Sequence, residues 1–354
     1  MQLTKYKLGD LITQRREKNK DYDLPIRGVS REGFIKPKIE EADTSIYNVF
    51  YKNDFVFNPA RMELNSIALN LDLDKALCSS LYEVFYVKDE NVVLPEFLNL
   101  HIKRDEFARH CDYIGLGSAR EYCRFANIAE FDIMIPPIEI QREIVQADRQ
   151  IKRRIRLNEQ MIEKLEATAQ ALYRKMFVDG IDKENLPEGW RMGTLEDVVI
   201  IRYGKAHERI ADGDIPIYGS GGIMRYGNKA LFDMPSVLIP RKGSLNNIMY
   251  VDIPFWTVDT MFYTQMRIKN VSKYLYIYLC QFDFLSMDAG SAVPSMTSQM
   301  LNQMEILIPD EKTLGLFEEQ ESIIFRNINL HKQEISKLSE LQSLLLVKMG
   351  SLKQ

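Results

Sequence analysis

Two adjacent prolines, Pro136 and Pro137, are a first candidate for chemistry, because enzymes that methylate base amines hold a flipped base beside such a pair. That reaction needs a polar residue before the prolines to hold the amine and an aromatic residue after them to stack on the base. Ile135 and Ile138 occupy these positions and can do neither. We therefore interpret the prolines as a rigid break in front of a helix.

Other groups of residues are equally poor candidates for catalysis. The run 219–222 (Gly-Ser-Gly-Gly) could cradle a phosphate, but no Gly-Lys-Ser/Thr follows it. A flexible loop that touches a DNA backbone, or simply a turn, is the better interpretation. Asp310-Glu311-Lys312 comes nearest to an acidic cluster for metal-dependent cleavage and is interpreted as an exposed helix start. The 4 cysteines and 4 histidines are dispersed without a Cys-x-x-Cys pair, which argues against a zinc site or a disulfide framework.

The elements that would position functional residues occur twice at a constant offset. With a shift of 173 positions, Gly117-Ser118-Ala119 falls on Gly290-Ser291-Ala292, and Ile135-Pro136 falls on Ile308-Pro309. The offset holds over roughly sixty residues, which indicates two long equivalent modules and not a solenoid of many short repeats.

Each copy ends in a helical pattern. Apolar residues recur at heptad spacing from Gln141 to Met176 and again from Phe317 to Met349, which predicts two helices about 50–60 Å long. Asn158 and His331 interrupt the pattern at matching positions; we expect them to fix the register of a helix pair, the alternative being that they face solvent. The predicted seam comprises Ile151, Ile155, Asn158, Ile162, Leu165, Leu172, Ile324, Ile328, His331, Ile335, Leu338 and Leu345.

The segments between the helices are rich in aromatic and β-branched residues punctuated by Gly, Pro and Asn, which is typical of short strands in mixed domains. Leu8 and Asp10 align with Leu195 and Asp197 when small gaps are allowed. We predict an α+β protein with two mixed α/β domains separated by a pair of long antiparallel helices (a coiled coil) in a pseudo-twofold internal repeat. We expect the first domain at 1–138 and the first helix at 139–179. The linker and the second domain should follow at 180–311, and the second helix at 312–354.

Composition sets broad limits on function. The chain has 354 residues, 45% of them hydrophobic and 27% charged, and a net charge of −4, which gives no global attraction to nucleic acid. Phosphate contacts need only a local basic surface, so the charge balance alone does not decide. Apolar runs are far shorter than the ~20 residues needed to span a bilayer, and the start lacks an export segment, so we expect a cytoplasmic protein without membrane contact.

Ordered motifs on this repeat resemble those of the specificity subunits of type I restriction–modification systems. Residues 135–145 are similar to the start of the family's first conserved helix, 172–177 to its end, and 186–190 to the opening of the second target-recognition domain. Strand–loop signatures are similar at 215–222, at 236–243, and at 254–256 with Asp259-Thr260. The resemblance covers essentially the whole chain, and its specificity lies in the order of the motifs.

The resemblance implies a non-catalytic subunit whose two recognition domains each read one half of an asymmetric bipartite DNA target. The helices would set the spacing and dock methylation subunits. The implied partners are double-stranded DNA, two methylation (M) subunits and, in the full complex, restriction (R) subunits. No cofactor is expected on this chain, and the methylation partner is expected to use S-adenosylmethionine. A self-contained DNA methyltransferase or nuclease and a coiled-coil protein adaptor remain as alternatives.

DNA reading requires Arg or Lys for guanine and Asn or Gln for adenine, with Lys, Ser and Tyr on phosphates. In the first domain the candidates are Arg27, Arg31, Lys36, Lys38, Asn58, Arg61, Ser118, Arg120, Tyr122 and Arg124. In the second they are Lys205, Arg209, Tyr218, Ser220, Arg225, Arg241, Lys242, Asn246, Asn247, Ser291 and Ser295. Any one of them could instead be a solvated surface side chain. The pairs Arg61/Lys242 and Ser118/Ser291 match between the copies, which favours them.

Overall fold

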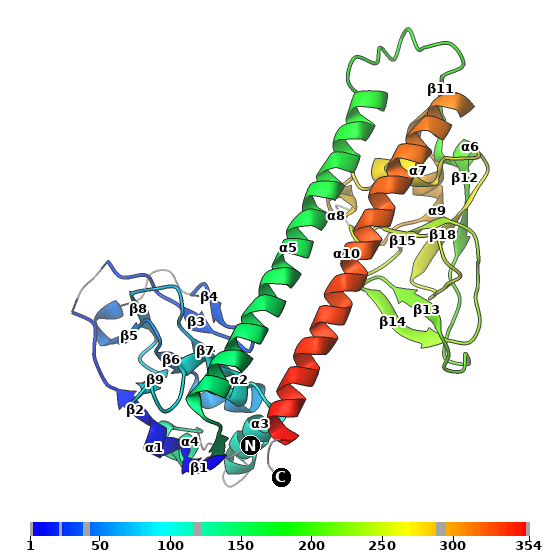
Figure 1. The fold of residues 1–354 in the computed structure, drawn as a ribbon. Coiled ribbons are helices and arrows are strands. Elements are labelled where there is room, and N and C mark those ends of the chain that lie inside the picture. The colour runs from blue at the N-terminus through cyan, green and yellow to red at the C-terminus, as the bar shows by residue number, and fades with distance from the viewer. Residues whose placement is uncertain (1–2, 21–22, 38–42, 116–121, 288–294, 352–354) are drawn as a thin grey trace. The chain divides into compact units, whose positions relative to one another are not determined.

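The computed structural model describes residues 3–20, 23–37, 43–115, 122–287 and 295–351, and the chain divides into two compact units. The first unit comprises residues 1–157 and 334–354, and the second comprises residues 158–333. Each unit contains one α/β domain and a part of both long helices, α5 (Ile138–Phe177) and α10 (Glu311–Ser351) (Figure 1).

The first unit begins with a strand–turn–strand segment and continues through short strands into small helices. Its elements before α5 are β1 (Thr4–Lys7), α1 (Leu8–Leu11), β2 (Ile12–Arg15), β3 (Gly28–Val29), β4 (Phe34–Ile35), the 3-10 turn η1 (Thr44–Ile46), β5 (Asn48–Tyr51), β6 (Phe55–Phe57), the 3-10 turn η2 (Pro59–Leu64), β7 (Ile67–Leu69), β8 (Lys75–Cys78), β9 (Glu83–Val87), α2 (Pro95–Ile102), α3 (Asp105–Gly115), α4 (Phe125–Ala129) and β10 (Asp132–Ile135).

A four-stranded antiparallel sheet in the order β2-β9-β6-β7 forms the centre of the first domain. The Phe55 and Phe85 rings stack on one face of this sheet with centroids 4.7 Å apart, and Val56 and Val84 are buried on the other. Separate two-stranded pairs are β1-β10, β3-β4 and β5-β8. Val145 of α5 and Met349 of α10 belong to the same apolar core, so both helices are packed onto this domain.

The second unit repeats this plan with a different central region. Its elements before α10 are β11 (Arg191–Thr194), α6 (Leu195–Val198), β12 (Val199–Tyr203), β13 (Ile215–Gly219), β14 (Gly222–Gly227), β15 (Ser236–Pro240), β16 (Met249–Val251), β17 (Trp256–Thr257), β18 (Met261–Met266), α7 (Ser272–Leu279), α8 (Phe284–Met287), α9 (Ser298–Asn302) and β19 (Glu305–Ile308).

The sheet order β12-β18-β15-β16 in the second unit corresponds strand for strand to β2-β9-β6-β7 in the first. The outer pair β11-β19 likewise corresponds to β1-β10. The aligned anchors have the same roles, since Leu8 and Leu195 are fully buried and Asp10 and Asp197 accept hydrogen bonds from the backbone N–H three residues earlier. A three-stranded sheet, β14-β13-β17, has no counterpart of that order in the described part of the first unit. The predicted α+β class and internal repeat are confirmed.

In the first unit the two helices pack through polar contacts as well as apolar ones. The Gln342 side-chain amide donates to Asp148 Oδ1 at 2.7 Å, and Arg154 Nε lies 2.6 Å from Glu334 Oε1. The later residue on α5, Arg154, contacts the earlier residue on α10, Glu334, so the helices run antiparallel (Figure 1).

The second unit contains the contact between the matched polar positions. His331 Nδ1 lies 2.6 Å from Asn158 Oδ1, and the Asn158 side chain is only 4% exposed. Contact between equivalent residues is what twofold pairing of two repeated helices gives. Farther along, Tyr173 and Phe177 pack their rings against Phe317 in the core of this unit. The other predicted seam residues are buried or half-buried.

The ends of the helices follow from local sequence. β10 ends at Ile135 and α5 begins at Ile138, so the two prolines separate strand from helix as predicted. Asp310 caps α10 by accepting from the Thr313 hydroxyl at 2.6 Å and from the Thr313 N–H at 3.0 Å, and these hydrogen bonds lower its pKa to about 2. Trp190 Nε1 also donates to Asp310, at 2.8 Å. Helix α10 continues through Gly350 to Ser351.

Candidate nucleic-acid interface

In the first unit the turn after β6 meets the segment before α4. The Cys123 N–H donates to the Pro59 carbonyl at 3.0 Å, which joins the turn that carries Arg61 to the segment that carries Tyr122 and Arg124. Arg61 is exposed, and Tyr122 is 50% exposed with the Arg124 guanidinium 5.6 Å from its ring centroid. We call Arg61, Tyr122 and Arg124 the first basic surface. Cations over exposed aromatic rings suit contact with phosphates and bases.

Two neighbours limit what this surface can do. Arg124 lies 3.4 Å from Glu83 Oε1, so part of its charge is already paired. Asn58 uses its side-chain oxygen to cap η2 by accepting from the Ala60 N–H at 3.1 Å, which is a structural role. Arg61 therefore remains the most available cation among the candidates on this turn.

The candidates Arg27, Arg31 and Lys36 belong to the hairpin of β3 and β4 and its flanks, and not to the first basic surface. Lys103 holds this hairpin by donating to the carbonyls of Arg31 at 2.7 Å and Ile67 at 2.8 Å. Burial lowers the pKa of Lys103 to about 8. The Arg27 guanidinium donates to the adjacent Ile26 carbonyl.

The second unit builds the equivalent junction with other side chains. The Met296 N–H donates to the Arg241 carbonyl at 2.9 Å, and Lys242 forms a β-bridge with Ser295. The Arg241 guanidinium lies 5.1 Å from the Tyr203 ring centroid and donates to the Asp259 carbonyl at 2.9 Å. We call Tyr203, Arg241, Lys242 and Ser295 the second basic surface. Lys242 is exposed, as Arg61 is at the matched position.

The loops around the second basic surface are tied together by hydrogen bonds from side chains to backbone carbonyls. Asn247 Nδ2 donates to the Ser220 carbonyl at 2.8 Å, which holds the tip of the β13–β14 hairpin against the loop after β15. Lys205 is exposed, and its carbonyl accepts from Trp256 Nε1 at 2.9 Å. Gly204 must be glycine, because a Cβ there would lie 2.0 Å from the Val258 carbonyl oxygen.

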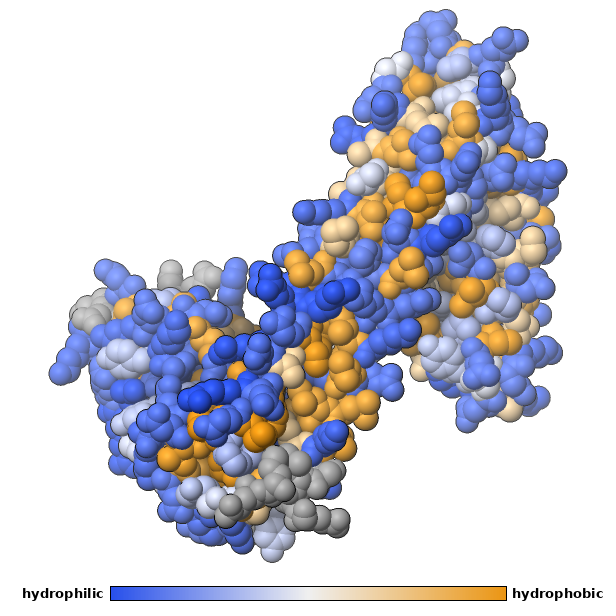
Figure 2. Space-filling model, viewed as in Figure 1, coloured by the Kyte–Doolittle hydropathy of each residue, from blue (hydrophilic) through white to orange (hydrophobic). Residues whose placement is uncertain are grey.

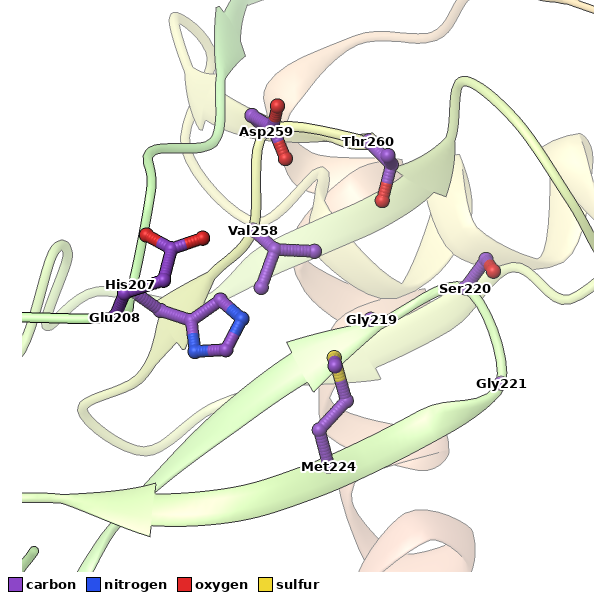
Figure 3. A pocket seen from close by; sticks show the side chains of 9 residues that line it. All are labelled: His207, Glu208, Gly219, Ser220, Gly221, Met224, Val258, Asp259 and Thr260. Carbon is purple, nitrogen blue, oxygen red and sulfur yellow. The ribbon is translucent and has the colours of Figure 1, made fainter.

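A cavity of about 370 Å³ lies between these loops. Figure 3 shows His207 and Glu208 on one side and Ser220 and Gly221 on the other, with 258–260 between them. Glu208 and Asp259 line this cavity, and neither residue is among the candidates predicted from the sequence. The cavity is therefore formed by segments whose proximity could not be predicted from the sequence.

Several candidates are engaged in the fold itself. Arg225 donates to the carbonyls of His207 at 2.5 Å and Ile210 at 2.9 Å, and so holds the loop that bears Arg209. Asn246 Nδ2 donates to Asp283 at 2.8 Å. Tyr218 is half-buried against Phe255, and burial raises the pKa of its phenol. The candidates Lys38, Ser118, Arg120 and Ser291 lie outside the described residues.

Tyr203 is a candidate that sequence reasoning missed. It is 50% exposed, its hydroxyl lies 3.0 Å from Ser298 Oγ, and it stacks with Arg241. The available signal was its place at the end of an apolar strand directly before Gly204.

The described residues contain no group of three or more His, Cys, Asp or Glu side chains placed to hold a metal ion. Within the same residues, no helix has both the length and the apolar character required to cross a bilayer.

The sequence and the fold of this chain match those of known proteins. The family model for the type I restriction modification DNA specificity domain matches residues 3–167 and 187–340. The specificity subunit of the type I restriction enzyme HindI from Haemophilus influenzae is 31% identical over 110 residues, which span 30% of this chain and only 24% of that subunit.

Two solved structures share the fold along the whole chain. The crystal structure of the S subunit of a type I restriction–modification system from M. genitalium has a TM-score of 0.66 and 17% identity, covering 98% of this chain and 96% of that one. A structure described as showing complex assembly and conformational transition of the type I R-M system has a TM-score of 0.50 and 18% identity, covering 98% and 97%. Because the family model matches both halves of the repeat, the chain belongs to the family of type I restriction–modification DNA specificity domains.

Proposed function

We propose that this chain is the DNA-sequence specificity subunit of a type I restriction–modification complex and has no catalytic activity of its own. The observation that carries the proposal is that both units build the same junction, a turn after a buried strand bonded to the segment before a short helix. The side chains on the two junctions differ, Arg61 with Tyr122 in one and Lys242 with Tyr203 in the other. Each unit would therefore read a different half of an asymmetric bipartite target.

Residues 1–138 and 180–311 would form the recognition domains, and 139–179 and 312–354 the spacer helices. A stiff helix pair supports this role, because readers of half-sites about one duplex turn apart need a spacer of roughly 34–36 Å. Cleavage and methylation would belong to partner subunits, with S-adenosylmethionine bound by the methylation partner. This chain would contribute selectivity alone.

An exposed apolar stripe on α10 supports docking of a partner helix. Leu316, Ile323 and Leu330 follow each other at heptad spacing and are 49%, 59% and 56% exposed. Figure 2 shows apolar side chains exposed among polar ones over the helices. The equivalent positions on α5 are Glu143, Gln150 and Leu157, which are mostly polar. We propose that methylation subunits dock on the helices, with two M subunits in the methylating complex and R subunits joining it for cleavage.

The proposal is tested by mapping methylated bases across the genome of cells with and without this gene. We expect one bipartite, asymmetric sequence to lose methylation when the gene is deleted. An unchanged methylation pattern, in cells that express the methylation partner, would contradict the proposal. Methyl transfer or DNA cleavage by the pure isolated chain would support a self-contained enzyme. Assembly with partners but no sequence preference would support a protein adaptor.

Arg225 offers a test of which cations contact DNA. Replacing Arg225 with methionine frees the loop at 207–210, and we expect affinity for the cognate duplex to fall about tenfold while the dependence of affinity on salt is nearly unchanged. Replacing Lys242 with methionine is the matched control and should lower the salt slope by about one unit. Binding titrations of the assembled complex over a salt series measure both. A loss of about one unit for Arg225→Met would assign it to a phosphate instead.

A further inference from the structure

Glu321 is a buried carboxyl group on α10 in the second unit. Its side chain is 0% exposed, and neither carboxylate oxygen has a hydrogen-bond partner among the residues that the structure describes. Buried polar atoms are almost always paired, because an unpaired buried carboxylate loses its hydration without compensation. An ionised Glu321 at this position would therefore be strongly unfavourable.

The internal repeat provides the comparison. Asp148 occupies the position 173 residues earlier and is also buried, at 5% exposed. It accepts a hydrogen bond from Gln342 at 2.7 Å and an ion pair from Lys152 at 2.7 Å. The residue that stands 173 positions before Gln342 is Ala169, which is buried in the second unit at 4% exposed. The same helix register therefore places the Gln342 amide beside Asp148 and the Ala169 methyl group beside Glu321.

The charged groups near Glu321 do not replace the missing partner. Lys273 of α7 pairs with Glu318 at 2.6 Å and lies 5.2 Å from the Tyr250 ring, so its ammonium group is already used. Glu318 is one turn away on the same helix and repels a second negative charge. The ionisable groups of α5 in this region are Glu166 and the buried phenol of Tyr173. The negative charge of Glu166 helps to raise the pKa of Tyr276 of α7, and the Tyr173 ring packs against Tyr274.

We propose that Glu321 is a proton-operated lock on the pairing of α5 and α10 in the second unit. Uncharged, the carboxyl group is accommodated in the helix interface beside Ala169. Ionised, it favours opening of this part of the helix pair, because water can then reach the charge. Asp148 does not act in this way, since its carboxylate is paired with Lys152 and accepts the hydrogen bond from Gln342.

The direction of the pH effect follows from the pKa. Burial raises the pKa of Glu321 from its ordinary value of 4.5 to about 7, Lys273 opposing the shift and Glu318 adding to it. The opened state ionises first, so the closing contribution of Glu321 is complete below about pH 4.5 and is lost as the pH rises to about 7. A shift of this size corresponds to a change in the opening equilibrium on the order of a hundredfold.

The experiment is amide hydrogen exchange of the full chain between about pH 5 and about pH 8, corrected for the intrinsic exchange rate. In the unmodified chain, the opening equilibrium of α10 amides around residue 321 should rise by about a hundredfold with pH, and amides around residue 342 should not follow. Glu321→Gln should flatten the response at 321. Asp148→Asn, the matched control, should leave it in place.

A response at 321 that persists unchanged in Glu321→Gln would overturn the proposal. Where that variant fails to fold, the unmodified chain still decides, because equal pH dependence at 321 and at 342 would also overturn it.

Discussion

Replacing Gln141 with alanine is expected to lower the free energy of unfolding of the first unit by about 3–5 kcal/mol. Gln141 is 0% exposed and makes three hydrogen bonds. Its side-chain oxygen accepts from the Leu94 N–H at 2.9 Å, and its amide donates to the carbonyls of Val92 at 2.8 Å and Pro136 at 2.9 Å. Alanine would leave three backbone groups buried without partners, each costing about 1–3 kcal/mol.

Urea unfolding of the full chain, followed by a probe in the first unit, measures this effect. Gln150→Ala, at an exposed position of the same helix, is the control and should change stability by less than about 0.5 kcal/mol. A loss below about 1 kcal/mol for Gln141→Ala would show that these hydrogen bonds do not anchor α5 to the first domain. The repeat places Leu314 at the equivalent position of α10, so this polar anchor belongs to the first unit alone.

Reversing the charge at the matched turns, Arg61→Glu together with Lys242→Glu, is expected to weaken DNA binding by at least about a hundredfold near physiological salt. Each replacement removes an exposed cation from a basic surface and adds a carboxylate that repels phosphate. Each is worth about tenfold or more, and two sites on separate units should act independently. The slope of log affinity against log salt should fall by about two units.

Fluorescence titration of the assembled complex with its cognate duplex tests this prediction. Lys183→Glu has the same charge change in the linker before the second domain and should leave affinity within about threefold. Equal losses in the control and the double variant would mean that net charge, and not these two turns, governs binding. Far-ultraviolet circular dichroism of each variant establishes that the fold is retained.

The architecture was predictable because the helices and the repeat leave periodic marks in the sequence. Heptad spacing predicted α5 and α10, and the constant offset predicted that Asn158 and His331 would be equivalent; the structure shows them in contact. The pairing of β1 with β10 and the four-stranded sheet order were not predictable, because strand neighbours depend on chain crossovers that leave no local pattern.

The candidate interface was predictable only in part. The repeat aligns Arg61 with Lys242, and the structure places each of them shortly after a buried strand, β6 or β15. Arg225 and Asn246 have the residue types of DNA-contacting side chains, yet their hydrogen bonds go to loops of their own domain. Residue type cannot distinguish these roles, because the same guanidinium or amide serves a phosphate, a base or a backbone carbonyl. Tyr203 was missed for the same reason, since its stacking with Arg241 is a tertiary contact.

The central proposal is that a rigid helix pair would hold two unlike readers at a fixed spacing along a duplex. Its most direct test is the affinity of the assembled complex for its own target with two base pairs inserted between the half-sites. Such an insertion moves one half-site by roughly 7 Å and turns it by roughly 70°. We predict that affinity then falls at least about a hundredfold, to the level of non-specific DNA. Affinity equal to that for the unmodified target would contradict the account.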